Sequence, residues 1–90
     1  MSVTAVKIKI MPISPEVDLN QIEKKVKLVI EKNSGKNCSF KQEPIAFGLK
    51  AIIVLFAWPE EQELEKLENT LKKIENVNSV QIVDIRRAFG

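Results

Sequence analysis

Histidine is absent from this chain of 90 residues, and cysteine occurs once, at Cys38. Without histidine the sequence lacks the commonest general base and the commonest metal-binding side chain. A single cysteine excludes an internal disulfide and any two-cysteine metal or redox motif. These absences argue against an enzyme, and we predict no catalytic residue, no metal site and no cofactor.

Glycine is also scarce, with three residues in the chain. A glycine-rich phosphate-binding loop cannot be assembled from them. The segment 47–50, Phe-Gly-Leu-Lys, holds one fragment of an RNA-recognition motif, but the first predicted strand lacks the aromatics that such a module needs. An acylphosphatase-like enzyme would need a phosphate-cradling loop and an arginine where the chain has Met11-Pro12-Ile13-Ser14. Neither class is supported.

Long hydrophobic runs are missing too. No apolar stretch approaches the roughly 18 residues of a membrane span, and the N-terminus has no apolar signal segment. The formal net charge of +2 is too small to indicate nucleic-acid binding by itself. Ninety residues suit one domain, covering 1–90. We therefore expect a cytoplasmic, single-domain protein with no membrane partner and no direct nucleic-acid partner.

The stretch from Gln42 to Ala57 organises the chain. Its second half, Leu49–Ala57, is apolar at every position except Lys50 and is rich in Ile, Val, Leu and Phe. A run of this kind predicts a central strand that is covered on both faces, because a strand with one solvated face would alternate more cleanly.

A chain reversal is predicted just before this strand, at Pro44-Ile45-Ala46-Phe47-Gly48. Proline removes a hydrogen-bond donor from the sheet and glycine permits a positive φ. The hairpin tip would then expose Ile45 and Phe47, and an exposed aromatic on a rigid tip is typical of a partner contact. The alternative is that Phe47 folds back over one end of the core, and the pattern alone does not decide between the two.

Before this hairpin the sequence predicts a strand and a helix. Val3–Met11 alternates between apolar residues and lysines, and Pro12–Pro15 ends the strand. A helix should begin at Asp18, with Gln21 completing a capping box, and should stop at Asn33–Gly35. Its core-facing stripe comprises Leu19, Ile22, Val26, Val29 and Ile30.

Around the central strand the signals are of mixed strength. Asn37–Glu43 is a weaker strand, with Cys38 and Phe40 on one face. Pro59 is expected to break the central strand and to open a second helix with Glu60-Glu61 capping its start, and this helix should end near Glu75 or Asn76. Its apolar stripe comprises Leu64, Leu67, Leu71 and Ile74.

The last strand is predicted over Val80–Ile85, with Val80 and Ile82 on one face and Val83 and Ile85 on the other. The order β-α-β-β-α-β predicts an α+β fold, the ferredoxin-like sandwich, with a four-stranded antiparallel sheet and two helices on one face.

That fold leaves one face of the sheet open. Two apolar sets compete for this face, and one of them must lie there: either Ile52, Val54 and Phe56, or Ile53 and Leu55. The open face is then either covered by long side chains or in contact with a partner.

Three segments together resemble a known family, archaeal elongation factor 1-beta. These are MPISPEVDL at Met11–Leu19, EPIAFGLKA at Glu43–Ala51 and IENVNSVQIVDI at Ile74–Ile85, and the likeness covers nearly the whole chain. The family is the counterpart of the guanine-nucleotide exchange domain that acts on elongation factor 1-alpha in eukaryotes. The resemblance implies a ferredoxin-like fold and the release of GDP from that translational GTPase, without covalent chemistry by the factor.

The resemblance also implies a partner-binding site. Eukaryotic members have an aromatic at the position of Phe47 that inserts against the GTPase, and a lysine next to the C-terminus that disturbs the magnesium site. This chain departs from the second feature, because it ends Arg86-Arg87-Ala88-Phe89-Gly90, so Arg86 or Arg87 is the candidate cation. The predicted partner-binding residues are Pro44, Ile45, Phe47, Gly48, Lys50, Arg86 and Arg87.

Two other readings stay open. The chain could be a regulatory or self-associating module of the same fold that uses the open sheet face, which predicts a concentration-dependent dimer. It could also bind single-stranded RNA through the lysines of its first half, which predicts a steep dependence on salt. Trp58 and Phe56 could stack on bases, but packing in the core is the favoured use of these two rings. The sequence leaves the oligomeric state undetermined.

Overall fold

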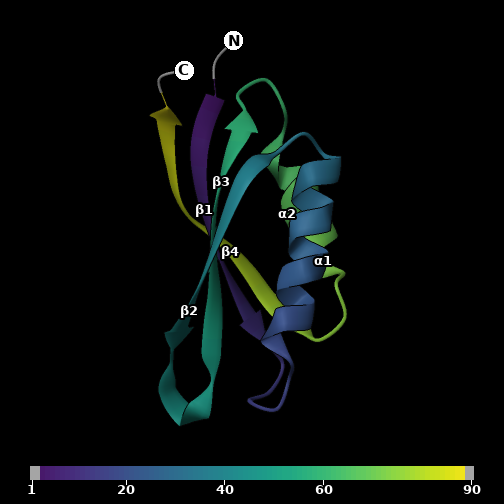
Figure 1. Cartoon of the computed structure of the whole chain (residues 1–90), viewed down its shortest axis with the longest axis vertical. Coiled ribbons are helices and arrows are strands. Elements are labelled where there is room, and N and C mark those ends of the chain that lie inside the picture. The colour runs from purple at the N-terminus through teal and green to yellow at the C-terminus, as the bar shows by residue number, and fades with distance from the viewer. Residues whose placement is uncertain (1–2, 89–90) are drawn as a thin grey trace.

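The computed structural model describes residues 3–88, which form a four-stranded sheet with two helices. The elements in chain order are β1 (Val3–Pro12), α1 (Leu19–Lys32), β2 (Lys36–Pro44), the 3-10 turn η1 (Ala46–Gly48), β3 (Lys50–Pro59), α2 (Leu64–Lys72) and β4 (Val77–Ala88). The strands lie in the order β2-β3-β1-β4, all neighbours being antiparallel, and both helices cover one face (Figure 1). The predicted ferredoxin-like sandwich is confirmed.

The core lies between the helices and alternate residues of the two central strands. Three cross-strand pairs of β1 and β3 are buried there: Val6 with Phe56, Ile8 with Val54, and Ile10 with Ile52. The helical stripes close the core from above with Ile22, Val26, Ile30, Leu67 and Leu71. Of the two apolar sets that competed for the open face, Ile53 and Leu55 therefore occupy it.

The open face corrects the prediction that β3 is covered on both sides. Leu55 is 47% exposed, and Ile53 is half-buried. Lys9 of β1 and Lys41 of β2 lie directly across from Ile53, so the aliphatic parts of these lysines flank it. The apolar run reflects the central position of β3 between two neighbouring strands, and no second layer covers this face within residues 3–88.

The N-terminus of α1 is capped as predicted by Asp18, but without a capping box. The Asp18 carboxylate accepts a hydrogen bond from the backbone N–H of Asn20 at 3.0 Å. The side chain of Gln21 is exposed and makes no hydrogen bond to the described part of the chain. Asp18 bonds to the second helical residue rather than the third, so both bonds of a capping box are absent.

The C-terminus of α1 ends in a Schellman-type turn in which serine, rather than glycine, adopts the left-handed conformation. Ser34 has φ of 76°, and its N–H bonds to Glu31 O at 3.1 Å, while Gly35 N–H bonds to Ile30 O at 2.8 Å. Gly35 serves close packing instead. A Cβ at this position would lie 2.3 Å from Ile30 Cγ2 and 3.3 Å from the Trp58 ring.

The start of α2 differs from the prediction. Pro59 lies at the end of β3, opposite Val3, and the helix begins only at Leu64. The fixed φ of proline is compatible with a strand end as well as with a helix start. A turn intervenes, in which Gln62 N–H bonds to Pro59 O at 3.1 Å and the Trp58 indole N–H donates to Gln62 O at 3.1 Å.

The end of α2 also comes earlier than predicted, at Lys72. Beyond it the backbone tightens, and Ile74 N–H bonds to Leu71 O at 3.2 Å. Asn76 then takes φ of 71° and turns the chain into β4. Ile74 still packs against the core, so the apolar stripe was identified correctly although its last member lies in a turn.

A bulge in β4 overturns the predicted alternation of the last strand. Ile82 lies opposite Ile8 and Asp84 opposite Lys7, so Val83 is the extra residue. Ile85 consequently lies opposite Val6, on the same side of the sheet as Ile82 and not on the side predicted for it, and 55% of its surface stays exposed. The strand is also longer than predicted, so Arg86, Arg87 and Ala88 belong to it, while Phe89 and Gly90 of the expected tail lie outside the described residues.

We predict that Gly35→Ala lowers the free energy of unfolding by about 1–3 kcal/mol, because the new methyl group overlaps Ile30. The adjacent change Ser34→Gly should raise it by up to about 1 kcal/mol, because glycine adopts a positive φ without strain. Urea unfolding of the two variants measures both. Equal stability of Gly35→Ala and the unsubstituted chain would contradict the packing role.

Candidate functional site

The connection between β2 and β3 is a closed loop at one end of the sheet (Figure 1). Pro44 and Lys50 are the last paired residues of the two strands. Ile45 N–H bonds to Leu49 O at 2.7 Å, and Leu49 N–H bonds to Ala46 O at 3.3 Å. These bonds fix the loop 45–49 on top of a two-stranded support, as the reversal predicted at Pro44–Gly48 requires.

Phe47 stands at the tip of this loop with 94% of its surface exposed. The alternative in which it folds back over the core is therefore wrong. Its backbone has φ of 63° and ψ of 30°, and Gly48 follows with φ of 76°. A bulky residue in the left-handed region costs about 1–2 kcal/mol relative to an ordinary conformation. Phe47 thus contributes no burial to the fold and strains the backbone.

The other residues predicted in the hairpin lie around Phe47. Pro44 is exposed and Ile45 is half-buried, so Ile45 is less accessible than predicted. Lys50 is exposed, and its ammonium has no ion-pair partner within residues 3–88. The structure therefore brings all five predicted hairpin residues together at one end of the molecule.

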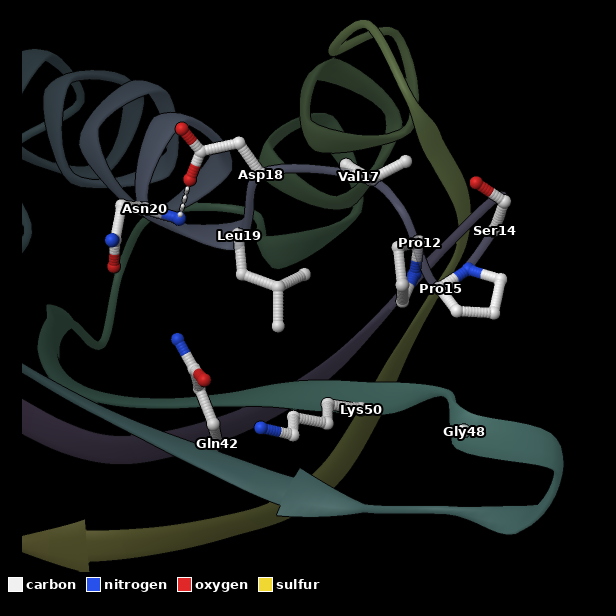
Figure 2. A pocket seen from close by; sticks show the side chains of 10 residues that line it. All are labelled: Pro12, Ser14, Pro15, Val17, Asp18, Leu19, Asn20, Gln42, Gly48 and Lys50. Carbon is white, nitrogen blue, oxygen red and sulfur yellow. Dashed lines mark hydrogen bonds between the residues drawn. The ribbon is translucent and has the colours of Figure 1, made fainter.

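A hollow of about 250 Å³ opens beside the hairpin, between it and the loop that joins β1 to α1 (Figure 2). It is lined by Pro12, Ser14, Pro15, Val17, Asp18, Leu19, Asn20, Gln42, Gly48 and Lys50. The loop and the hairpin approach closely here, since a Cβ on Gly48 would lie 4.0 Å from Pro15 Cβ. Sequence reasoning missed this hollow, although the β-α-β-β order places both connections at the same end of the sheet.

Arg86 and Arg87 lie in β4 and are both engaged in ion pairs. Arg86 Nε donates to Asp84 Oδ2 at 2.8 Å, and an Arg87 guanidinium N–H donates to Glu60 Oε1 at 2.8 Å. Both arginine side chains remain largely exposed. Glu60 was predicted to cap the second helix, but it lies before α2 and binds Arg87 instead. Exposed pairs of this kind contribute about 0–1 kcal/mol, so a partner can displace them at little cost.

The arginines and the hairpin occupy opposite ends of the sheet (Figure 1). Arg86 lies opposite Ala5, which lies opposite Ala57 in β3, whereas the hairpin begins at Lys50. With a rise of about 3.3 Å per residue, the seven steps from Lys50 to Ala57 span about 23 Å. The seven predicted partner-binding residues therefore form two groups rather than one cluster.

Other candidate chemistry is weak in the described part of the chain. Burial raises the pKa of the Cys38 thiol, with Glu31 adding to the shift and Lys27 opposing it, so Cys38 is a poor nucleophile. No group of three or more Cys, Asp or Glu side chains among residues 3–88 could hold a metal ion. Within the same residues, no helix is long and apolar enough to span a bilayer.

Trp58 and Phe56 are both buried and meet edge to face with ring centroids 5.9 Å apart. They pack in the core under the helices and present no ring surface to a nucleic acid. The favoured interpretation of these rings as core residues is confirmed, and they give no support to RNA binding.

Comparison with known proteins gives this architecture a family. The model of the EF-1 guanine nucleotide exchange domain matches residues 5–88. The chain belongs to this family. It is 43% identical to elongation factor 1-beta of Methanosarcina barkeri, over 97% of this chain and 99% of that protein. It is 40% identical to elongation factor 1-beta of Methanocaldococcus jannaschii, over 98% of this chain and 100% of that protein. The resemblance seen in the sequence is confirmed, and it supports a role as a guanine nucleotide exchange factor in translation elongation.

Solved structures agree on the fold. Ribosomal protein S6 from Thermotoga maritima superimposes with a TM-score of 0.66 at 20% identity, covering 98% of this chain and 89% of that one. The ACT domain of GTP pyrophosphokinase from Chlorobium tepidum gives 0.61 at 16% identity, covering 88% and 96%. At such identities the likeness shows the architecture alone.

Because Phe47 is exposed, we predict that Phe47→Ala changes the free energy of unfolding by less than about 0.5 kcal/mol. Phe47→Gly should raise it by up to about 1 kcal/mol, because glycine removes the strain at φ of 63°. Urea unfolding of both variants measures these changes in the free energy of unfolding. A clear loss of stability in Phe47→Ala would mean that the ring packs on the domain after all.

Proposed function

We propose that this chain, as one exchange domain over residues 1–90, releases GDP from elongation factor 1-alpha by binding the nucleotide-free GTPase. The observation that carries the proposal is Phe47, a strained and almost fully exposed aromatic on a rigid hairpin in a chain of the exchange-factor family. An aromatic of this kind supplies binding energy when it enters a pocket of a partner. Pro44, Ile45, Gly48 and Lys50 hold and surround it.

The proposed mechanism needs no covalent chemistry from the factor. An exchange factor binds the empty GTPase more tightly than the GDP-loaded one. By linkage, bound GDP lowers the affinity of the GTPase for the factor by the same ratio as the bound factor lowers its affinity for GDP. Each tenfold loss of GDP affinity requires about 1.4 kcal/mol of differential binding. Phe47 provides such a difference if its pocket on the GTPase is open only in the empty state. The cytoplasm, where elongation takes place, is the proposed location.

Arg86 and Arg87 form the second part of the proposed contact. The family resemblance implies a cation near this end of the chain, and the exposed Arg87 of β4 is a candidate, since only a weak ion pair with Glu60 holds it within residues 3–88. An anionic group of the GTPase or its nucleotide would replace the carboxylate of Glu60. A guanidinium in that place competes with magnesium for the same negative charge.

We predict that Phe47→Ala lowers the rate of GDP release by about 30-fold, the equivalent of ~2 kcal/mol at an interface hot spot. Release of a fluorescent GDP analogue from the cognate elongation factor 1-alpha, with the variant at substoichiometric amount, measures this. Leu28→Ala is the matched control, because Leu28 is an exposed apolar residue on the outer side of α1. Unchanged release by a folded Phe47→Ala variant would remove Phe47 from the mechanism.

The same assay tests the arginines. Arg87→Ala should slow release by about tenfold, and Arg87→Lys should restore most of the rate if charge alone is required. The effect of Arg87→Ala should shrink when magnesium is removed with a chelator. Equal slowing with and without magnesium would mean that Arg87 binds elsewhere on the partner.

One observation favours a second candidate. Leu55 is an exposed leucine in the middle of the open sheet face, which suits self-association through that face. Leu55→Lys distinguishes the two proposals, since it would abolish a dimer in analytical ultracentrifugation and leave GDP release unchanged if exchange proceeds through the hairpin and β4.

A further inference from the structure

The proposed function does not involve the hollow beside the hairpin. It lies directly against Gly48, the residue that follows Phe47, and its far wall is the loop between β1 and α1 (Figure 2). A partner surface that contacts Gly48 together with Phe47 would also reach this hollow.

The lining has an apolar part and a cationic part. Leu19 points from α1 toward the two strands, and Pro15 and Val17 form the wall beside it (Figure 2). The side chain of Lys50 lies along the opposite wall. The hollow is thus suited to a guest that combines an apolar side chain with a negative charge.

Lys50 is the one cation in the lining of the hollow, and the carboxylates of Asp18 and Glu23 lie close by. Asp18 is the one carboxylate in the lining, but it is directed to the helix terminus, where Asn20 N–H binds it at 3.0 Å. The partial positive charge of that terminus compensates Asp18. Gln42 is likewise engaged, its amide donating to Glu23 Oε2 at 3.1 Å. The Lys50 ammonium has no ion pair within residues 3–88.

We propose that this hollow receives a protruding segment of the partner GTPase that carries an acidic side chain next to an apolar one. The proposal rests on the proposed function, since continuity with Phe47 identifies the partner. The carboxylate of the guest pairs with Lys50, while its apolar neighbour covers Pro15, Val17 and Leu19. The hairpin end then has a convex element, Phe47, and a concave one, and the β1–α1 loop belongs to the docking surface.

The test obstructs the hollow without touching the hairpin. Asn20→Trp places an indole in the lining, whereas Gln21→Trp adds the same group to the next residue of α1, which is exposed and outside the lining. We expect Asn20→Trp to raise the concentration of factor that gives half-maximal GDP release by about tenfold, and Gln21→Trp to leave it within about twofold. Urea unfolding of both variants verifies that each is folded.

Lys50 is tested in the same assay. Lys50→Gln should raise the half-maximal concentration and flatten its dependence on salt, and Lys50→Arg should restore both. When nucleotide-free GTPase is added to the factor labelled with nitrogen-15, the backbone amide NMR signals of Val17 and Asn20 should also shift.

The outcomes separate this inference from the proposed function. If Phe47→Ala loses exchange while Asn20→Trp behaves as the unsubstituted chain, the hollow is not a contact and the proposed function stands. If the unsubstituted chain neither accelerates release nor binds the GTPase, both fail. If acetate or inorganic phosphate alone shifts the same signals at low millimolar concentration, the hollow is a small-anion site and the proposal is overturned.

Discussion

The register between β1 and β3 is the constraint on which the rest of the molecule depends. It places Val6, Ile8 and Ile10 against Phe56, Val54 and Ile52 beneath the helices. A slip of one residue would turn Lys7 and Lys9 into the core, where an unpaired ammonium is very costly, so this register has no close competitor. This register also fixes the position of β3 and therefore of the hairpin at one end of the sheet. The arginines at the other end are positioned by the separate pairing of β1 with β4.

Local patterns were sufficient to predict most of this fold, because each is written in neighbouring residues. The alternation in β1 and the helical stripes of α1 and α2 appear in the structure, and Pro44 and Gly48 do bracket a reversal with Phe47 exposed. The predictions were wrong where contacts between residues distant in sequence determine the local structure. Pairing with β1 creates the bulge at Val83, and pairing with Val3 keeps Pro59 in β3. The hollow is lined by segments that are far apart in the sequence, and Arg87 is far from Glu60. No local sequence pattern therefore predicts either feature.

The features of Phe47 that destabilise the fold are the same ones that suit the partner contact proposed for it. Its ring buries nothing, its backbone lies in the left-handed region, and glycine would serve the turn better. The fold tolerates this strain because paired strands on both sides hold the loop. A rigid loop also loses little conformational entropy when it binds, so more of the contact energy of the ring is available for affinity. A flexible tip would relieve the backbone strain, but it would lose more conformational entropy on binding and so bind more weakly.

If the hairpin and the arginines are the two contacts, as proposed, their separation would give the exchange factor a means of distinguishing states of its partner. Since β3 runs unbroken between the hairpin and the level of Arg86, the spacing of about 23 Å is rigid. Once one end is bound, the other binds as an intramolecular event, provided the partner presents its two sites at the matching distance. A GTPase conformation that alters this distance loses the second contact entirely. Under the proposed function, selectivity for the empty state would then depend on this spacing as well as on the charge that Arg87 meets.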